Sequence, residues 1–325
     1  MAEGETRRKG LLNAVLFVLT VLSTFFVGLN WALNYVSAES ISRAAASGGF
    51  GHVAVDFGLK DLLAPPVMAL AALYAVVLMA ILGGHELGHY LTCRRNGLEA
   101  TLPYFIPFPS LIGTLGAFIR IKSPVGRKEQ FFDIGASGPL TGFLLAVPAL
   151  VVGVALSKVL PMPQTDGSIS LGEPLLLKIA ARLLLGPIPA GSDIIIHPIG
   201  FAGWVGLLVT ALNLIPVGQL DGGHVAYALL GPKSAKLAPL ILVILVAMGV
   251  FLWAGWLLWA VIVALFMFLP RFRHPRVFDE ERTLSRGRVI LGFAVLVVFI
   301  LSFIPDPIKG FDLWGLLKHA GLGVK

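Results

Sequence analysis

Long apolar runs are the feature that most constrains what this chain can fold into. They cover most of its 325 residues, and only 13% of all residues are charged, against about 25% in an average soluble domain. A helix that crosses a membrane needs about 20 mostly apolar residues, and several runs meet that length with almost no charge. The sequence therefore predicts an all-α polytopic membrane protein.

The apolar runs, with the prolines, glycines and charges at their ends, define the expected spans. We expect about seven transmembrane helices, or six if the longest run is a single helix. The polar segments between them are short for an independent domain of about 50 residues, so residues 1–325 are expected to form a single membrane domain. The expected spans are residues 11–33, 65–93, 132–156, 198–230, 236–269 and 289–304.

Residues 236–269 are ambiguous because they are long enough for one helix or for a tight pair. Cytoplasmic ends of membrane helices carry an excess of Lys and Arg. One helix would place Arg271 and the arginines after it on the other side of the membrane from Lys233 and Lys236. Two helices would return these arginines to the same side of the membrane as the two lysines. We therefore expect two helices.

Residues 101–121 are apolar but poorly suited to a helix, because they contain three prolines and two glycines. Basic residues flank both ends, which indicates that the segment enters and leaves the membrane on one side. Non-helical backbone at membrane depth is tolerated only where it is buried in protein or lines a cavity. We expect a re-entrant, membrane-embedded β-hairpin beside a cavity.

Charge and cysteine content exclude other classes of function. The formal charge of +7 does not indicate nucleic-acid binding, because the basic residues lie beside the apolar runs. The single cysteine, Cys93, cannot form an intrachain disulfide, and there is no C-x-x-C metal motif. Redox chemistry is therefore not expected.

The motif HELGH lies near the basic end of the expected 65–93 helix. His85 and His89 are four residues apart, so they share one helix face and can bind one metal ion, with Glu86 beside them. Ionisable side chains inside an apolar span need partners and indicate a functional site. The alternative is a structural, hydrogen-bonded cluster.

A third metal ligand is expected, because catalytic zinc has three protein ligands and one water. The pattern H-E-x-x-H-x-x-G-x-x-H fails, since Thr92 and Arg95 occupy its glycine and histidine positions. Glu99 lies beyond the basic end of the span. Asp221 in NLIPVGQLDGGH is the better candidate, because an interrupted membrane helix can turn a carboxylate toward its neighbour. The alternative for Asp221 is a simple Asp-Gly turn.

HELGH together with NLIPVGQLDGG resembles the site-2 protease family of intramembrane zinc metalloproteases. IPFPSLIGTLGAFIRIKSP and FDIGASGPLTGF resemble the re-entrant strand segment and the third core helix of that family. The resemblance covers about residues 78–230 and implies a catalytic core at about 65–230. No segment is long enough for the PDZ or CBS domain of other members, so we expect the compact type.

The resemblance implies one zinc ion per chain, with His85, His89 and Asp221 as its ligands and Glu86 as the general base. It also implies that Asn213 contacts the substrate backbone; the alternative for Asn213 is a hydrogen bond within the protein at the helix break. The implied reaction is hydrolysis of peptide bonds within or near transmembrane helices of other membrane proteins.

A substrate helix must be locally extended before its carbonyls can be attacked, because they are hydrogen-bonded within the helix. The strand-like residues 113–117 could pair with the extended substrate, which makes Gly113, Thr114 and Gly116 candidate substrate-binding residues. The alternative for the two glycines is simple hairpin geometry.

The resemblance suggests as substrates membrane-anchored transcription regulators or anti-sigma factors, already trimmed by another protease. The alternatives are a metal transporter or channel, because intramembrane His, Glu and Asp also line ion pathways, and a catalytically silent relative that binds helices. No transit peptide is evident in the sequence. We therefore expect a bacterial plasma membrane, with the active site toward the cytoplasm.

Overall fold

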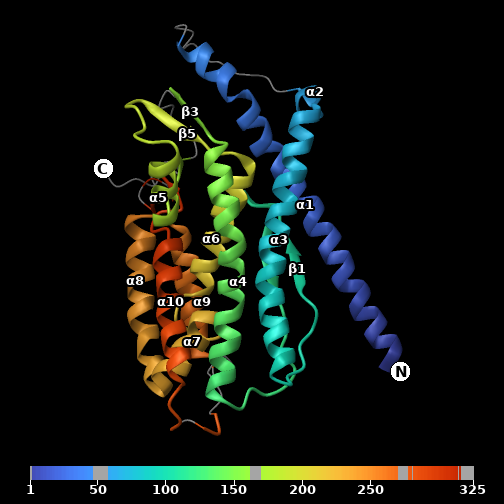
Figure 1. Ribbon diagram of the computed structural model, residues 1–325, viewed down its shortest axis with the longest axis vertical. Helices are drawn as coiled ribbons and strands as arrows, with labels where there is room; N and C mark the ends of the chain where they lie inside the picture. The colour runs from blue at the N-terminus through green and yellow to red at the C-terminus, as the bar shows by residue number, and fades with distance from the viewer. Residues whose placement is uncertain are drawn as a thin grey trace.

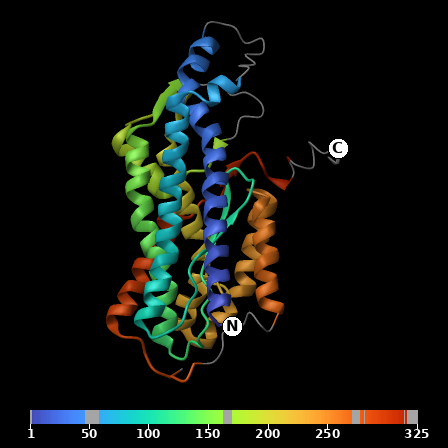
Figure 2. The ribbon, with the colours of Figure 1, turned by 90° about the vertical axis from the view of Figure 1, so that its right-hand side faces the viewer.

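The computed structural model describes residues 2–46, 58–161, 170–269, 277–279, 281–313 and 315. Most of these residues are helical, and the strands are few and short. Four helical stretches are long and apolar enough to cross a membrane: Gly10–Arg43, Pro65–Arg95, Lys128–Ala155 and Asp221–Phe251. The described part of the chain is therefore consistent with a polytopic membrane protein (Figures 1 and 2).

The helices are arranged around one central member, α4, which contacts α3, α6 and α7 (Figure 1). The first helices are α1 (Ala2–Ala46), α2 (Leu59–Leu62), α3 (Pro65–Arg95), α4 (Lys128–Ala155) and α5 (Leu175–Leu184). The later ones are α6 (Pro198–Asn213), α7 (Asp221–Leu230), the 3-10 helix η1 (Gly231–Lys236), α8 (Leu237–Phe251), α9 (Gly255–Phe268) and α10 (Arg286–Ser302).

Helix α3 begins and ends where its sequence dictates. Pro65 and Pro66 occupy the first turn, where their missing amide hydrogens have no intrahelical partner to lose. The helix ends after Arg94 and Arg95, and Gly97 follows with φ of +70°, a conformation that glycine adopts readily. At 1.5 Å per residue, its 31 residues extend about 46 Å, enough to cross a hydrocarbon core of about 30 Å.

Helix α1 is much longer than the apolar run at residues 11–33. It continues to Ala46 because residues 34–46 contain neither glycine nor proline and include several alanines. In Figure 1 this helix slants along one side of the molecule.

Two of the expected helical stretches are divided in the structure. Residues 198–230 form α6 and α7, separated by residues 214–220. Residues 236–269 give α8 and α9, which pack against each other. Of the arginines that follow α9, Arg271, Arg273 and Arg276 lie outside the described residues.

Residues 101–121 contain two short strands, β1 (Tyr104–Pro107) and β2 (Thr114–Phe118), which pair antiparallel with an irregularity between Phe105 and Pro107. Side chains of α1 bind the backbone of this hairpin: Asn13 donates to the carbonyl of Leu102, and Trp31 donates to that of Leu111. The hairpin is thus held between α1 and α3.

Four further strands form two small pairs at the end of the molecule where α5 lies (Figure 1). The strand β3 (Lys158–Pro161) pairs with β5 (Ser192–Ile195), and β4 (Ser170–Leu171) pairs with β6 (Ile308–Lys309). Beside them, α5 exposes Lys178 and Arg182 and buries Leu177 and Ala180. With its basic residues on one face and its buried apolar residues on the other, α5 is an amphipathic helix.

The main core lies between α3, α4 and α6. Its buried side chains include Tyr74, Leu78, Leu150, Phe201, Trp204 and Leu207. Gly153 of α4 faces Gly200 of α6 so closely that a β-carbon on Gly153 would overlap the Gly200 backbone. Helices in lipid associate through close packing rather than through exclusion of water, so such contacts fix the helices around the site.

Candidate metal centre

Three potential metal ligands from two distant parts of the chain converge at the centre of the helix bundle. His85 and His89 lie one turn apart on α3, and Asp221 is the first residue of α7. The Nε2 atom of each histidine is 3.2 Å from the Asp221 carboxylate. One ligand atom from each of the three residues lies within 4.8 Å of the others. All three could therefore bind a single ion.

The hydrogen bond of His89 fixes which ring nitrogen can bind a metal. Its Nδ1 lies 2.8 Å from the carbonyl oxygen of Ile134 in α4. A carbonyl oxygen only accepts, so Nδ1 carries the hydrogen, and in the neutral ring the lone pair is on Nε2, facing Asp221. A lone pair and a carboxylate oxygen 3.2 Å apart repel each other unless a proton or a metal ion lies between them. The donor set therefore fits a metal ion.

The interruption between α6 and α7 places Asp221 at the site. Gly222 follows Asp221, and a β-carbon at Gly222 would overlap the carbonyl of Leu214 at the end of α6. Gly223 likewise lies against the backbone of Val217. Because these two glycines let the start of α7 pack against the backbone of residues 214–220, the connection is compact and α7 begins beside α3.

A row of glycines on α4 faces the three ligands. A β-carbon on Gly135 would lie 2.7 Å from the Asp221 carbonyl, and one on Gly142 would lie 3.0 Å from Nδ1 of His85. At Gly138 it would overlap the His89 ring. Small residues spaced along a membrane helix in this way are typical of close helix packing. The structure adds that each faces one metal-ligand candidate, a role that their spacing alone does not reveal.

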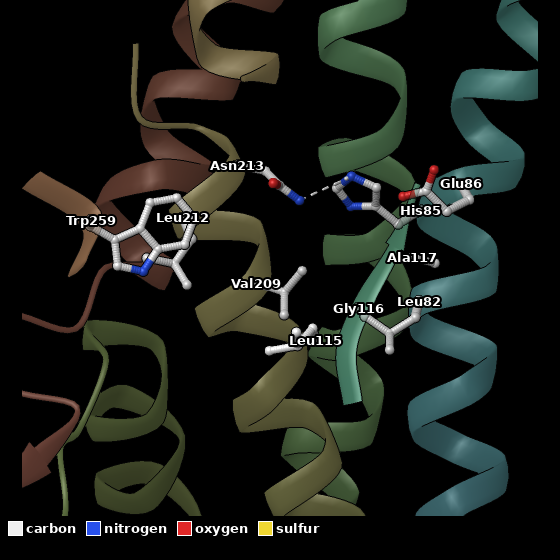
Figure 3. A pocket seen from close by; sticks show the side chains of 10 residues that line it. All are labelled: Leu82, His85, Glu86, Leu115, Gly116, Ala117, Val209, Leu212, Asn213 and Trp259. Carbon is white, nitrogen blue, oxygen red and sulfur yellow. Dashed lines mark hydrogen bonds between the residues drawn. The ribbon is translucent and has the colours of Figure 1, made fainter. Parts of the chain in front are cut away.

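Next to the ligands lies a cavity of about 110 Å³ (Figure 3). His85, Glu86 and Asn213 form its polar part. Glu86 is 5% exposed, and Nδ2 of Asn213, the last residue of α6, is 3.4 Å from Nε2 of His85. A buried carboxylate thus lies in the same cavity as a ligand imidazole and a carboxamide, where it could take up and release a proton.

The three hairpin candidates have different surroundings. Gly116 lines the cavity, has φ of +98°, and has open space where a β-carbon would be. The hydroxyl of Thr114 donates to the Ile106 carbonyl at 2.8 Å and accepts from the Gly116 amide at 2.9 Å, which stabilises the hairpin. Gly113 packs on the backbone of Thr24 in α1. Only Gly116 of the three borders the cavity.

The cavity also has lining residues that sequence reasoning missed. Val209 and Leu212 of α6 contribute to it, as does Trp259 of α9. The first two precede Asn213 by four residues and by one, so the helical period could have found Val209 once Asn213 was chosen. No sequence signal connects Trp259 with HELGH.

The sequence matches known proteins over the part that contains this site. Residues 73–254, more than half of the chain, match the model of peptidase family M50. The chain is 32% identical over 241 residues to "Probable zinc metalloprotease EGY2, chloroplastic" of Oryza sativa subsp. indica, covering 72% of this chain and 42% of that protein. It is 29% identical over 317 residues to "Probable zinc metalloprotease EGY1, chloroplastic" of Arabidopsis thaliana, covering 95% of this chain and 54% of that protein. No solved structure matches.

These matches correct the expected location. These relatives are plant proteins whose names call them chloroplastic, so the expectation of a bacterial plasma membrane is wrong. That expectation relied on the lack of a transit peptide. The chain spans about half the length of the curated relatives it matches, or less.

Proposed function

This chain belongs to peptidase family M50, and from that membership we propose that it is an intramembrane zinc metalloprotease. Its substrates are membrane proteins, cut within or near a transmembrane helix. The observation that carries the proposal is the convergence of His85, His89 and Asp221 within 4.8 Å, beside a cavity that contains Glu86.

His85, His89 and Asp221 would hold one zinc ion, because two imidazole nitrogens and a carboxylate oxygen are a donor set of catalytic zinc sites. When bound, zinc would polarise the scissile carbonyl and lower the pKa of a water to about 7. Among the described residues this is the single cluster of three such side chains. One site fits hydrolysis better than metal transport, which needs ligands repeated along a path.

Glu86 is the proposed general base and acid. It takes a proton from the attacking water as the water oxygen bonds to the carbonyl carbon, and it gives the proton to the nitrogen as the C–N bond breaks. Its burial excludes bulk water, so the proton stays within the site. No covalent intermediate with the protein is needed.

The proposed substrate-binding site is the edge of β2 that does not pair with β1. Within the described residues β2 pairs only with β1, and its residues Leu115, Gly116 and Ala117 border the cavity. An extended substrate can add to such an edge through main-chain hydrogen bonds. Asn213, across the cavity from this edge, would bind the opened backbone (Figure 3).

This function implies a specific membrane arrangement. We propose one membrane domain over residues 1–325, a catalytic core at about 65–230 and a hairpin that re-enters the membrane without crossing it. The proposed seven spans are α1, α3, α4, the broken α6–α7 pair, α8, α9 and α10. An interrupted pair that carries the site is typical of membrane proteins with a buried ligand.

The proposed substrates are membrane-anchored regulators that another protease has already trimmed, such as anchored transcription regulators or anti-sigma factors. This follows from the resemblance to site-2 proteases. The site itself selects for a chain segment that can be extended inside the membrane.

The test is cleavage of a single-span substrate in liposomes, with zinc content measured on each purified variant. Wild type is expected to cut within the span. Glu86→Gln should keep zinc and lose activity by about 100-fold or more, whereas Asp221→Ala should lose both. Glu99→Gln, which changes an exposed carboxylate beyond the end of α3, is the matched control and should behave as wild type.

Full activity of Glu86→Gln would contradict the general-base role. If every variant retained zinc and wild type cut nothing, the protease proposal would be overturned in favour of metal binding or transport.

A further inference from the structure

The cavity has an apolar part that bond cleavage itself does not use. Its polar side chains lie toward α3 and the end of α6, while the remaining walls are Leu82, Leu115, Ala117, Val209, Leu212 and Trp259. In Figure 3, Trp259 and Leu212 lie on the far side of the cavity from His85 and Glu86. An occupant with a peptide carbonyl at the polar end would therefore place a neighbouring apolar group against the tryptophan.

The volume of the cavity restricts what this apolar group can be. An engineered cavity of about 150 Å³ with a similar aliphatic and aromatic lining holds a benzene molecule. The whole cavity here, polar end included, is about 110 Å³, so its apolar part suits an aliphatic side chain better than a phenyl ring. Because Gly116 has no side chain, the backbone of an extended substrate can approach this wall closely.

Trp259 is held in place by its own helix. The buried face of α9 consists of Trp256, Ala260 and Val263, and the Trp256 indole donates to the Pro305 carbonyl at 2.7 Å. This anchor fixes the rotation of α9 and so directs Trp259, one turn after Trp256, toward the cavity. Helix α9 begins at Gly255, beyond residues 73–254 that match the family.

We propose that this cavity is a specificity pocket for an aliphatic side chain, of the size of Val, Leu or Ile, next to the scissile bond, and that Trp259 sets its upper size limit. The inference rests on the proposed protease function and deepens it. The catalytic side chains come from the family-matched region, and the size limit comes from the helix after it.

The test uses the full chain in liposomes and one single-span substrate whose cleavage site is first located by mass spectrometry with wild type. The residues on either side of that bond are then changed in turn to Ala, Leu or Phe, and kcat/KM is measured in competition. Wild type is expected to prefer Leu over Phe at one of these positions by about 10-fold or more, a typical effect of misfit in an apolar pocket.

Two variants change the pocket in opposite directions. Trp259→Ala enlarges it and should reduce the Leu over Phe preference by about 10-fold. Val209→Leu narrows it from the α6 wall and should shift the preference from Leu toward Ala. The matched control is Leu258→Ala, because Leu258 lies on the exposed face of the same helix and does not line the cavity; it should leave both ratios unchanged.

The outcomes separate this inference from the protease proposal. If wild type cleaves the substrate and all three variants show the same residue preference as wild type, the pocket proposal is overturned. Cleavage with preferences that shift only in Trp259→Ala and Val209→Leu supports it. If wild type cuts no substrate, the protease proposal fails and the pocket inference falls with it.

Discussion

The two sides of the cavity are held in place in different ways. On the metal side, α3, α4 and α7 approach so closely that β-carbons on Gly88, Gly135 and Gly138 would clash with backbone or with a ligand ring. On the opposite side, α9 buries only a narrow face and exposes Leu258, Val261, Leu265 and Phe268. At these three glycines the first side has no room for a methyl group, whereas α9 makes such close contacts at only part of its surface, where Leu257 lies against Gly249 and Phe266 against Gly218.

In the proposed protease, this difference separates the part that cleaves the peptide bond from the wall that selects the substrate side chain. A metal site needs its ligands within a few tenths of an ångström of a fixed geometry, and glycine contacts between helices give that rigidity in lipid. A pocket wall needs only the right size. We therefore expect substitutions of one methyl group to matter greatly on the metal side and little on the α9 side.

Gly138→Ala should have the largest effect among small substitutions. Its β-carbon would overlap the His89 ring, so the ring must shift from the position in which it contacts Asp221 and the Ile134 carbonyl. We expect zinc affinity to fall by about 100-fold, the upper end of the effect of altered groups around metal ligands, with a matching loss of cleavage at limiting zinc. Zinc titration with a competing chelator measures this directly.

Gly84→Ala is the control for Gly138→Ala. Gly84 adjoins His85, but its β-carbon would clash only with the end of the flexible Leu145 side chain, which can turn aside. We expect zinc affinity within about threefold of wild type, because substitutions away from tight contacts usually change the free energy of folding by no more than about 0.5 kcal/mol. Equal losses in the two variants would show that nearness to the ligands, rather than close packing, decides the outcome.

Arg288→Gln tests whether α10 belongs to the rigid side. Arg288 binds both carboxylate oxygens of Asp133 at 2.8 Å and reaches Glu129 at 3.0 Å. Asp133 precedes Ile134, whose carbonyl binds His89. Because the Arg288 side chain is 29% exposed, we expect a loss of about 1 kcal/mol, or about 2 °C in the thermal unfolding midpoint in detergent.

The control for Arg288→Gln is Arg286→Gln, which changes an exposed arginine at the start of the same helix. It should leave the unfolding midpoint unchanged. High salt should reduce the difference between Arg288→Gln and wild type, since screening weakens partly exposed ion pairs. A midpoint for Arg288→Gln equal to that of Arg286→Gln would place α10 with the loosely held side.

Local chemistry explains what could be predicted from the sequence. The apolar runs and their proline and glycine ends predict the helical class, because hydrophobic length and helix termination are local properties. The i, i+4 histidines predict a shared helix face, and an interrupted helix singled out Asp221. The structure brings these three side chains together, as the sequence interpretation requires.

What could not be predicted depends on contacts between distant segments. Nothing near Gly138 in the sequence indicates that it faces His89 rather than another helix, and nothing near Trp259 indicates the cavity. Gly113 and Gly116 look alike in the sequence, yet one packs against α1 and the other borders the cavity. Assigning such roles requires the tertiary arrangement.

Leu258→Ala should have the smallest effect of these changes. Leu258 lies on the outward face of α9 and is 65% exposed, so in a bilayer its side chain would contact lipid, which resembles leucine closely enough that little packing energy is lost. We expect the unfolding midpoint and the cleavage rate to match wild type, with a stability change within about 0.5 kcal/mol. Loss of cleavage at normal stability would show that the outer face of α9 contacts the substrate or another protein. In that case α9 would take part in binding beyond the single wall that Trp259 provides, and the contrast between the two sides of the cavity would no longer hold.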